Sequence, residues 1–447
     1  MVNVFLTVLL LGLTTLSTCG ESLFNVKNFG ATGNGITDDT EYVQAAINSA
    51  STVKNSTVLF PEGTYLVSSI VIKTNIKGIG NSVIKKIKMP LNLFIFCNIK
   101  DVNEVTVNNL TFDGSVALDS LGKPVEGSTP LLIYNCKNVD IKKCIFKNSP
   151  FGGLRVEACK NITVVNCKSL GSRGVFGDGY YFTGSNCVRV ENCIADDYER
   201  IGFVTEANSY NFVFINCLAQ NGKNSSILSG GIEYNAGFWY ENSANITTIR
   251  CVAKNNTHRG FVATTGSEIG AKIPDSSASF SYENCTSSNN PLGFAVSSFG
   301  KTVRIYLNNC SALHCTTGFH ATARDLNDRF DFSNCKVSLR PLNSKSLNSV
   351  GFNWESPVAK NSDNYEKLPL FNFTDCYVEY LKPVNYAQLT DNANNNGDIS
   401  TYAGGKAQIS ISGLSNSLTN HPTVIKARTG KPIYFIKGTK LDTQFKN

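Results

Sequence analysis

The sequence predicts an all-β fold built as a solenoid, a parallel β-helix, and two repeating patterns carry this prediction. The first pattern is a glycine followed by a short strand that begins with an aromatic residue. It recurs at Gly179-Tyr180, Gly202-Phe203, Gly237-Phe238, Gly260-Phe261, Gly293-Phe294, Gly318-Phe319 and Gly351-Phe352. One strand in every roughly two to three dozen residues is typical of a solenoid. The strand content favours a coil of β-strands over a helical array.

The second pattern is a column of cysteines, each preceded by apolar residues five and three places earlier. It includes Cys144, Cys167, Cys193, Cys217, Cys285, Cys310, Cys335 and Cys376. Such alternation predicts a strand that is buried on one side and ends in a turn. The residue before the cysteine is usually Asn, which tolerates the left-handed turn conformation and can bond to its image one coil away. We therefore expect an asparagine ladder beside an inward stack of mostly free thiols.

The first residues of the chain predict export. Residues 1–20 contain an uncharged apolar core from Val2 to Leu13, followed by small residues around Cys19, as in a secretory signal peptide. A lipoprotein signal at Cys19 is the alternative. No later apolar run reaches the ~20 residues of a membrane span. We expect a secreted protein, and nine Asn-x-Ser/Thr sequons suit glycosylation, although an Asn-rich repeat also generates them by chance.

The charge balance says little about a partner but argues against nucleic acid. The chain has 41 basic and 34 acidic residues, for a net charge of +7 with neutral histidines. No block of Lys and Arg predicts a nucleic-acid-binding face. The mild positive excess either suits an acidic substrate or carries no meaning.

The opening of the mature chain resembles a known family. The matching segments are Phe24 to Thr40, Gln44 to Ile47 and Val58 to Tyr65. They are similar to the N-terminal entry of the pectate-lyase-type superfamily, which includes polygalacturonases and phage tailspike depolymerases. The resemblance implies a single-stranded, right-handed parallel β-helix with an N-terminal capping helix.

The capping helix is expected from Glu41 to Ser49, with Asp38 as its N-cap and Glu41 completing a capping box. Capping explains Asp38 and Asp39 better than catalysis does. A helix at this end would cover the core and strand edges that an open coil exposes. We expect the β-helix over residues 21–385 and, because the composition turns Asn-, Gly- and Ser-rich, a C-terminal cap over residues 386–447.

The Gly-aromatic strands also place a candidate site. The first and third residues after each glycine are aromatic or apolar and should face inward, so the second and fourth face outward. This puts Glu206 and Glu241 on one face of adjacent coils, about 4.8 Å apart. Two carboxylates that close raise each other's pKa, as an acid and nucleophile or an acid and base require. Tyr181 and Trp239 flank them as rings that could stack on a sugar.

A second polar column lies just before the glycines. It contains Asp178, Glu199, Arg200, Glu233, His258 and Arg259. Arginine can bind a uronate carboxylate through two parallel hydrogen bonds. The alternative is a solvated rim of ordinary ion pairs.

Polygalacturonases offer a second, partial resemblance. Asp178 in Phe176-Gly177-Asp178-Gly179, and Asp196 with Asp197, are similar to the first two parts of their signature. The resemblance implies general-acid and water-activating roles for these three aspartates. The His-Gly and Arg-x-Lys parts do not follow at the family's spacing, so this mechanism stays open.

These observations predict a secreted β-helix protein that binds a polysaccharide and hydrolyses it without a cofactor or metal. The candidate catalytic residues are Asp178, Asp196, Asp197, Glu206 and Glu241. The candidate substrate-binding residues are Tyr181, Arg200, Glu233, Trp239, His258 and Arg259. One alternative is a lyase acting on a uronate polymer, with calcium held by Asp178, Asp196 and Asp197 beside a basic residue. The other is a non-catalytic glycan-binding or surface-structural protein.

Overall fold

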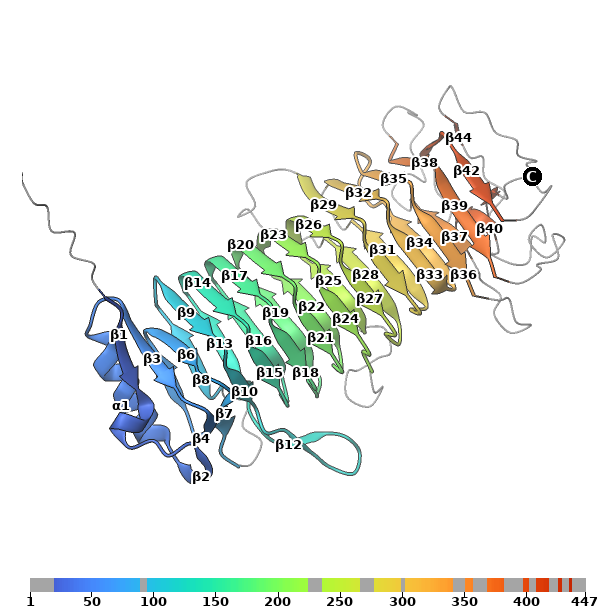
Figure 1. Cartoon of the computed structure of the whole chain (residues 1–447). Helices are drawn as coiled ribbons and strands as arrows, with labels where there is room; N and C mark the ends of the chain where they lie inside the picture. The colour runs from blue at the N-terminus through green and yellow to red at the C-terminus, as the bar shows by residue number, and fades with distance from the viewer. Residues whose placement is uncertain are drawn as a thin grey trace, which may run out of the picture.

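The chain winds into a long right-handed parallel β-helix, seen side-on in the computed structural model of Figure 1. The structure describes residues 20–88, 95–223, 235–265, 277–298, 302–340, 350–356, 368–381, 397–401, 407–417, 425–427 and 434–435. Within these residues each coil contributes one strand to each of three sheets, here named sheets A, B and C. Neighbouring strands within each of these sheets come from successive coils and run parallel.

Sheet A contains β1 (Ser22–Asn25), β3 (Ser56–Phe60), β6 (Asn75–Gly78), β9 (Val105–Asn108), β14 (Lys137–Lys142), β17 (Lys160–Val165), β20 (Asn186–Glu191), β23 (Ser209–Ile215), β26 (Ser243–Ile249), β29 (Ser277–Glu283), β32 (Thr302–Asn308), β35 (Arg329–Ser333), β38 (Leu370–Thr374), β41 (Gln408–Ile411) and β44 (Tyr434–Phe435).

Sheet B contains β2 (Asn34–Asp38), β4 (Gly63–Val67), β7 (Ser82–Lys86), β10 (Thr111–Asp113), β15 (Ile145–Lys147), β18 (Lys168–Leu170), β21 (Ile194–Asp196), β24 (Leu218–Gln220), β27 (Val252–Lys254), β30 (Thr286–Ser288), β33 (Ser311–Cys315), β36 (Lys336–Leu339), β39 (Cys376–Tyr380) and β42 (Leu414–Asn416).

Sheet C contains β5 (Ile70–Ile72), β8 (Cys97–Lys100), β13 (Leu131–Tyr134), β16 (Gly152–Glu157), β19 (Asp178–Thr183), β22 (Ile201–Glu206), β25 (Ala236–Glu241), β28 (Arg259–Thr264), β31 (Leu292–Ser297), β34 (Thr317–Thr322), β37 (Val350–Glu355), β40 (Gly397–Thr401) and β43 (Ile425–Ala427). The strands from β40 to β44 extend the three sheets past residue 385, where the composition suggested that the β-helix would end.

The predicted capping helix is present at the N-terminal end as α1 (Thr40–Ser51), after the short 3-10 turn η1 (Val26–Phe29). It buries Val43, Ala46, Ile47 and Ala50 against the first coils. Its N-cap is Asp39 rather than Asp38, and Asp39 makes no side-chain capping bond. The Asp39 carboxylate instead accepts hydrogen bonds from the backbone of Thr32 and Gly33. The Asp39 carboxylate therefore holds the loop before the helix instead of capping the helix.

The core follows the predicted columns. Phe203, Phe238, Phe261, Phe294, Phe319 and Phe352 stack with ring centroids 4.7 to 5.0 Å apart and nearly parallel planes. The cysteine column is buried beside them, and the fourteen cysteines of the described residues are free. The asparagine ladder is confirmed: Asn216 has a φ of 52° and donates from Nδ2 to Oδ1 of Asn192 at 3.1 Å. The interior is therefore set by identical residues in register.

One hairpin projects from the side of the β-helix. The antiparallel hairpin of β11 (Ala117–Leu118) and β12 (Pro124–Glu126) projects from the coil that follows β10, near the N-terminal end in Figure 1. It lies between sheets B and C in chain order, so it stands on the same edge as the turns that lead into the later sheet C strands. In the described part of the chain, no helix is long and apolar enough to span a membrane.

Candidate functional site

The outer face of sheet C carries the candidate site, as the alternation predicts. Parallel register aligns Tyr181 with Val204 and Val204 with Trp239. Glu206 and Glu241 follow the paired residues Thr205 and Tyr240, so they end adjacent strands on this face. The prediction that these side chains share one face is confirmed.

The middle of this face is apolar and covered. Ile201, Val204, Ala236, Trp239 and Val262 form a second hydrophobic cluster, with Tyr181 and Ala295 packed against it. Val204 is fully buried, and Trp239 is only 7% exposed. The open stacking ring expected at Trp239 is therefore wrong, because apolar neighbours on the adjoining strands pack around it. Tyr181 stays partly exposed at the edge of this cluster.

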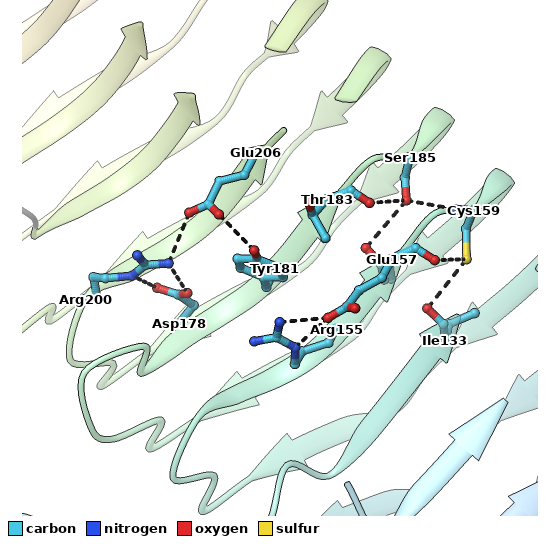
Figure 2. Close-up of polar contacts among 11 residues, drawn as sticks. Ile133, Arg155, Glu157, Cys159, Asp178, Tyr181, Thr183, Ser185, Arg200 and Glu206 are labelled. Atoms are coloured by element: carbon cyan, nitrogen blue, oxygen red, sulfur yellow. Dashed lines mark hydrogen bonds and ion pairs between the residues drawn. The ribbon is translucent and has the colours of Figure 1, made fainter. Parts of the chain in front are cut away.

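A charged network occupies the N-terminal side of the cluster (Figure 2). Arg200 donates from Nε to Asp178 Oδ1 at 2.8 Å and from Nη2 to Asp178 Oδ2 at 2.6 Å. The same Nη2 lies 3.3 Å from Glu206 Oε1, and the Tyr181 hydroxyl donates to Glu206 Oε2 at 2.8 Å. Asp178 is fully buried, whereas 22% of the Glu206 side chain is exposed. Of these two acids, Glu206 is the one that can reach a ligand.

The network keeps Arg200 charged and Tyr181 protonated. Burial works against the charged form of Arg200, but the adjacent Asp178 carboxylate raises its pKa above the usual value. Burial also raises the pKa of Tyr181, and the neighbouring Glu206 carboxylate raises it further. Arg200 therefore stays cationic, and Tyr181 stays a protonated donor at any pH near neutrality. Both groups donate hydrogen bonds to Glu206 and so orient its carboxyl group.

The preceding coil contains a second arginine–glutamate pair that the sequence reasoning missed. Arg155 donates from Nε and Nη2 to Glu157 Oε1 at 2.9 and 2.7 Å. Its guanidinium carbon lies 4.2 Å from the centroid of the Tyr181 ring, which is a cation–π contact. Arg155 and Glu157 occupy the second and fourth places after Gly153. Leu154 replaces the aromatic residue there, so a search that accepted any apolar residue would have found them.

Two phenylalanines just before the sheet C strands extend this surface. The rings of Phe151 and Phe176 lie 5.1 Å apart, and Phe176 is 41% exposed. Arg155 stacks on Phe151 at 4.6 Å, and Arg200 stacks on Phe176 at 4.9 Å. The two arginines are thus held between carboxylates on one side and aromatic rings on the other.

The other two predicted aspartates lie in separate polar clusters. Asp196 ends β21 of sheet B and accepts from Gln220 and Asn221 at 2.9 and 2.8 Å. Asp197 follows in the turn and pairs with Arg173 and with Lys223, whose Nζ lies 2.6 Å from Oδ1. Burial alone would raise the pKa of Asp197, but Lys223 and Arg173 lower it. The structure therefore gives Asp178, Asp196 and Asp197 three different sets of partners.

Two further predicted residues, His258 and Arg259, lie on the C-terminal side of the cluster. Arg259 begins β28, and its guanidinium carbon lies 5.2 Å from the Trp239 ring. His258 precedes it, and its carbonyl accepts from the backbone of Leu292 at 3.0 Å. Glu233 lies outside the described residues. Among the described residues, no three His, Cys, Asp or Glu side chains are grouped to hold a metal ion, and calcium dependence stays a prediction.

Sequence comparisons match parts of this chain to a polygalacturonase, a mannuronan epimerase and a plasmin- and fibronectin-binding protein. A family model described as "Rhamnogalacturonase A/epimerase, pectate lyase-like" matches residues 23–229. Plasmin and fibronectin-binding protein A of Streptococcus pneumoniae is 30% identical over 175 residues, which are 34% of this chain and 24% of that protein. Polygalacturonase ADPG1 of Arabidopsis thaliana is 29% identical over 200 residues, 39% of this chain and 46% of that protein. Mannuronan C5-epimerase AlgE1 of Azotobacter vinelandii is 32% identical over 120 residues, 23% of this chain and 8% of that protein. This chain therefore spans less than half the length of each of these relatives.

Solved structures share the fold. The surface adhesin PfbA of Streptococcus pneumoniae superposes with a TM-score of 0.51 and 13% identity, covering 89% of this chain and 93% of that one. The N-terminal fragment of gene product 12 of bacteriophage phi29 gives a TM-score of 0.51 and 16% identity, covering 93% of this chain and 73% of that one. At these identities the likeness concerns the β-helix itself.

Proposed function

Because this chain belongs to the pectate-lyase-type superfamily of right-handed parallel β-helix proteins, we propose that it hydrolyses an acidic polysaccharide bound across the outer face of sheet C. The matched relatives include a polygalacturonase and a mannuronan epimerase by name, and both names denote uronate polymers. We also propose that the protein is secreted, because its N-terminal segment resembles a signal peptide.

The observation that carries the proposal is the pair of accessible glutamates on this face. Glu157 aligns with Thr183, and Thr183 aligns with Glu206, so the two glutamates are two coils apart in one row. Two strand spacings place their Cα atoms roughly 9.6 Å apart. Side chains at this Cα separation can hold their carboxyl groups about 6.5–9.5 Å apart, the spacing that leaves room for a water molecule in inverting glycosidases. The side chains of Glu157 and Glu206 are 24% and 22% exposed, so both can meet a substrate.

The surroundings of the two glutamates support different roles. Arg200 and Tyr181 both donate hydrogen bonds to Glu206 and orient its carboxyl group, which suits the base that activates water. Arg155 is the only cation paired with Glu157 among the described residues. A uronate carboxylate would compete for the planar guanidinium of Arg155. Once its cation turns to the substrate, Glu157 is released from its ion pair and can serve as the general acid at the leaving oxygen.

Glutamine substitutions test this assignment. Glu206→Gln and Glu157→Gln each remove a proton-transferring group and should lower kcat by about 10²–10⁴-fold on polygalacturonate. Release of reducing ends measures hydrolysis, and ultraviolet absorbance of unsaturated products measures elimination. Glu191→Gln is the matched control, because Arg189 and Glu191 form the same pair two residues apart on the outer face of sheet A. Full activity in both test variants would reject the site. Unsaturated products would favour the lyase alternative.

A non-catalytic role is the second candidate, and the buried network favours it. Asp178 is fully buried and bonded to Arg200 through both oxygens, so it cannot transfer a proton to a bound sugar without breaking that pair. One matched relative is named for binding plasmin and fibronectin, and one similar structure is titled a surface adhesin. In this case polygalacturonate would bind in an affinity gel, but neither reducing ends nor unsaturated products would appear.

A further inference from the structure

A polar pocket lies toward the N-terminal end of the solenoid. It has a volume of about 410 Å³, within the range of small-molecule sites. Its polar lining includes Lys85, Lys86, Lys88, Asp113, Glu126 and Asn148, so sheet B forms one wall and the β12 arm forms another. None of these residues belongs to the network around Arg200.

Only some of the charged side chains that line the pocket have a partner of opposite charge within the described residues. Asp113 is satisfied, because it pairs with Lys147 at 3.5 Å and accepts from Asn148 at 3.0 Å. Lys86 is buried, and its Nζ donates to the Ser68 carbonyl. Lys85 and Lys88 form no ion pair within the described residues. This leaves two ammonium groups without a counter-ion, beside a buried third one, at the edge of a cavity.

Glu126 places an acceptor oxygen without a hydrogen-bond donor in the same pocket. Its Oε2 is buried and accepts no hydrogen bond, which is costly for a carboxylate oxygen. A ligand that offers both an anionic group and a hydroxyl would satisfy the lysines and Glu126 together. A uronic acid carries these two groups on one ring. A neutral sugar lacks the charge.

The pocket lies on the same edge of the solenoid as the turn that leads from Asp196 to Arg200. Asp113 at the end of β10 aligns successively with Lys147, Leu170 and Asp196, so three coils separate Asp113 from Asp196. This corresponds to roughly 14 Å along the axis. The exposed ring of Phe176 lies in a turn on the same edge, between these coils. A polymer lying along this edge would pass from the pocket over Phe176 to Arg200.

We propose that this pocket is a distal subsite that binds one uronate residue of the polymer. Lys85 and Lys88 bind its carboxylate, and Glu126 accepts a hydrogen bond from a ring hydroxyl. The inference rests on the proposed function for the kind of polymer, but it concerns binding and holds whether or not the polymer is cleaved. The subsite would favour polymers long enough to reach both the pocket and the Arg200 network.

Binding of oligogalacturonates to the full chain tests the subsite. The double variant Lys85→Gln with Lys88→Gln should weaken the binding of a long oligogalacturonate at least tenfold by calorimetry, and Glu126→Ala should weaken it severalfold. The control Lys27→Gln with Lys54→Gln removes the same charge at the exposed N-terminal cap and should bind like the wild type. Equal melting temperatures of the variants would show that each remains folded.

Three results would overturn the subsite. They are unchanged affinity in the Lys85/Lys88 variant, an equal loss in the Lys27/Lys54 control, and an equal loss of binding to a neutral cello-oligosaccharide. The hydrolysis proposal fails separately: a wild-type protein that releases no reducing ends but loses oligogalacturonate binding in the Lys85/Lys88 variant would keep the subsite and lose the hydrolase.

Discussion

The two faces of sheet C are built from the same strands, yet they follow opposite rules. On the inner face, the first residue after the glycine is Phe in six coils from Phe203 to Phe352, and the rings stack with nearly parallel planes. On the outer face, the next residue changes at every step. From β16 to β37 it is Arg155, Tyr181, Val204, Trp239, Val262, Ala295, His320 and Asn353.

This contrast shows where the repeat is constrained. Inside a coil, each side chain contacts its own image above and below, so one well-packed choice serves every coil. Outside, a side chain contacts solvent, a ligand or an unlike neighbour, and nothing requires repetition. A departure from the repeat on the outer face is therefore a better guide to function than the repeated residues of the inner face. The network of Arg155, Tyr181, Glu206 and Arg200 lies at such a departure.

The largest expected loss of stability follows a substitution on the inner face of sheet C. Phe238 is fully buried between Phe203 and Phe261, at 4.9 and 4.8 Å. Phe238→Ala should lower the free energy of unfolding by about 4 kcal/mol, through lost burial and the cavity left behind. Urea denaturation measures this loss. The outer-face control Thr183→Ala should change stability by less than about 0.5 kcal/mol. Equal losses in the two variants would remove the distinction between the faces.

Breaking the buried ion pair between Arg200 and Asp178 is expected to lower the free energy of unfolding nearly as much. Arg200→Gln leaves the Asp178 carboxylate fully buried without its cation, which should cost about 3 kcal/mol. The double variant with Asp178→Asn removes the stranded charge and should recover most of that loss. Urea denaturation of the two variants gives both values. A double variant as unstable as Arg200→Gln would show that packing, not charge, explains the effect.

His320 should make stability depend on pH. Burial lowers the pKa of His320 to about 4, and the nearby Arg259 cation adds to this. Between about pH 6.5 and this value, the unfolded chain binds a proton that the folded chain does not. Stability is therefore lost as the pH falls, by about 2 kcal/mol from pH 6.5 to 4.5. His320→Asn should lose this dependence in thermal unfolding followed against pH. An unchanged profile would assign the dependence to another group.

The smallest expected effect concerns the asparagine ladder at the turns. Asn216→Ala loses the hydrogen bond to Asn192 and forces a left-handed conformation on alanine, which should cost about 1–2 kcal/mol. Asn216→Gly keeps the conformation and loses only the side-chain hydrogen bonds, to Asn192 and from Arg250, so urea denaturation should show a smaller loss. If the two variants were equally stable, the backbone conformation would not contribute.

The sequence predicted the scaffold better than the site because the scaffold is periodic. Alternation and spacing placed the Phe stack, the cysteine column and the asparagine ladder, and the same register placed Glu206 and Glu241 on one face. Periodicity could not show that Trp239 is covered, because its exposure depends on neighbours from other coils. Arg155 and Glu157 were missed because Leu154 broke the aromatic pattern, although their spacing obeys it. The helix N-cap was misplaced by one residue, and the Asp39 carboxylate accepts hydrogen bonds from the backbone of Thr32 and Gly33 instead of capping the helix.

By itself the sequence determined that the chain coils, which residues point inward and which coils are neighbours, because each of these follows from a period of two within strands and a repeat between them. Only the tertiary structure decided which charges meet. Asp178 pairs with Arg200, Asp197 with Arg173 and Lys223, and Glu206 with Tyr181. The physical reason is that a long polar side chain has several partners within reach. Its choice among them depends on burial and rotamer, which a one-dimensional repeat does not specify.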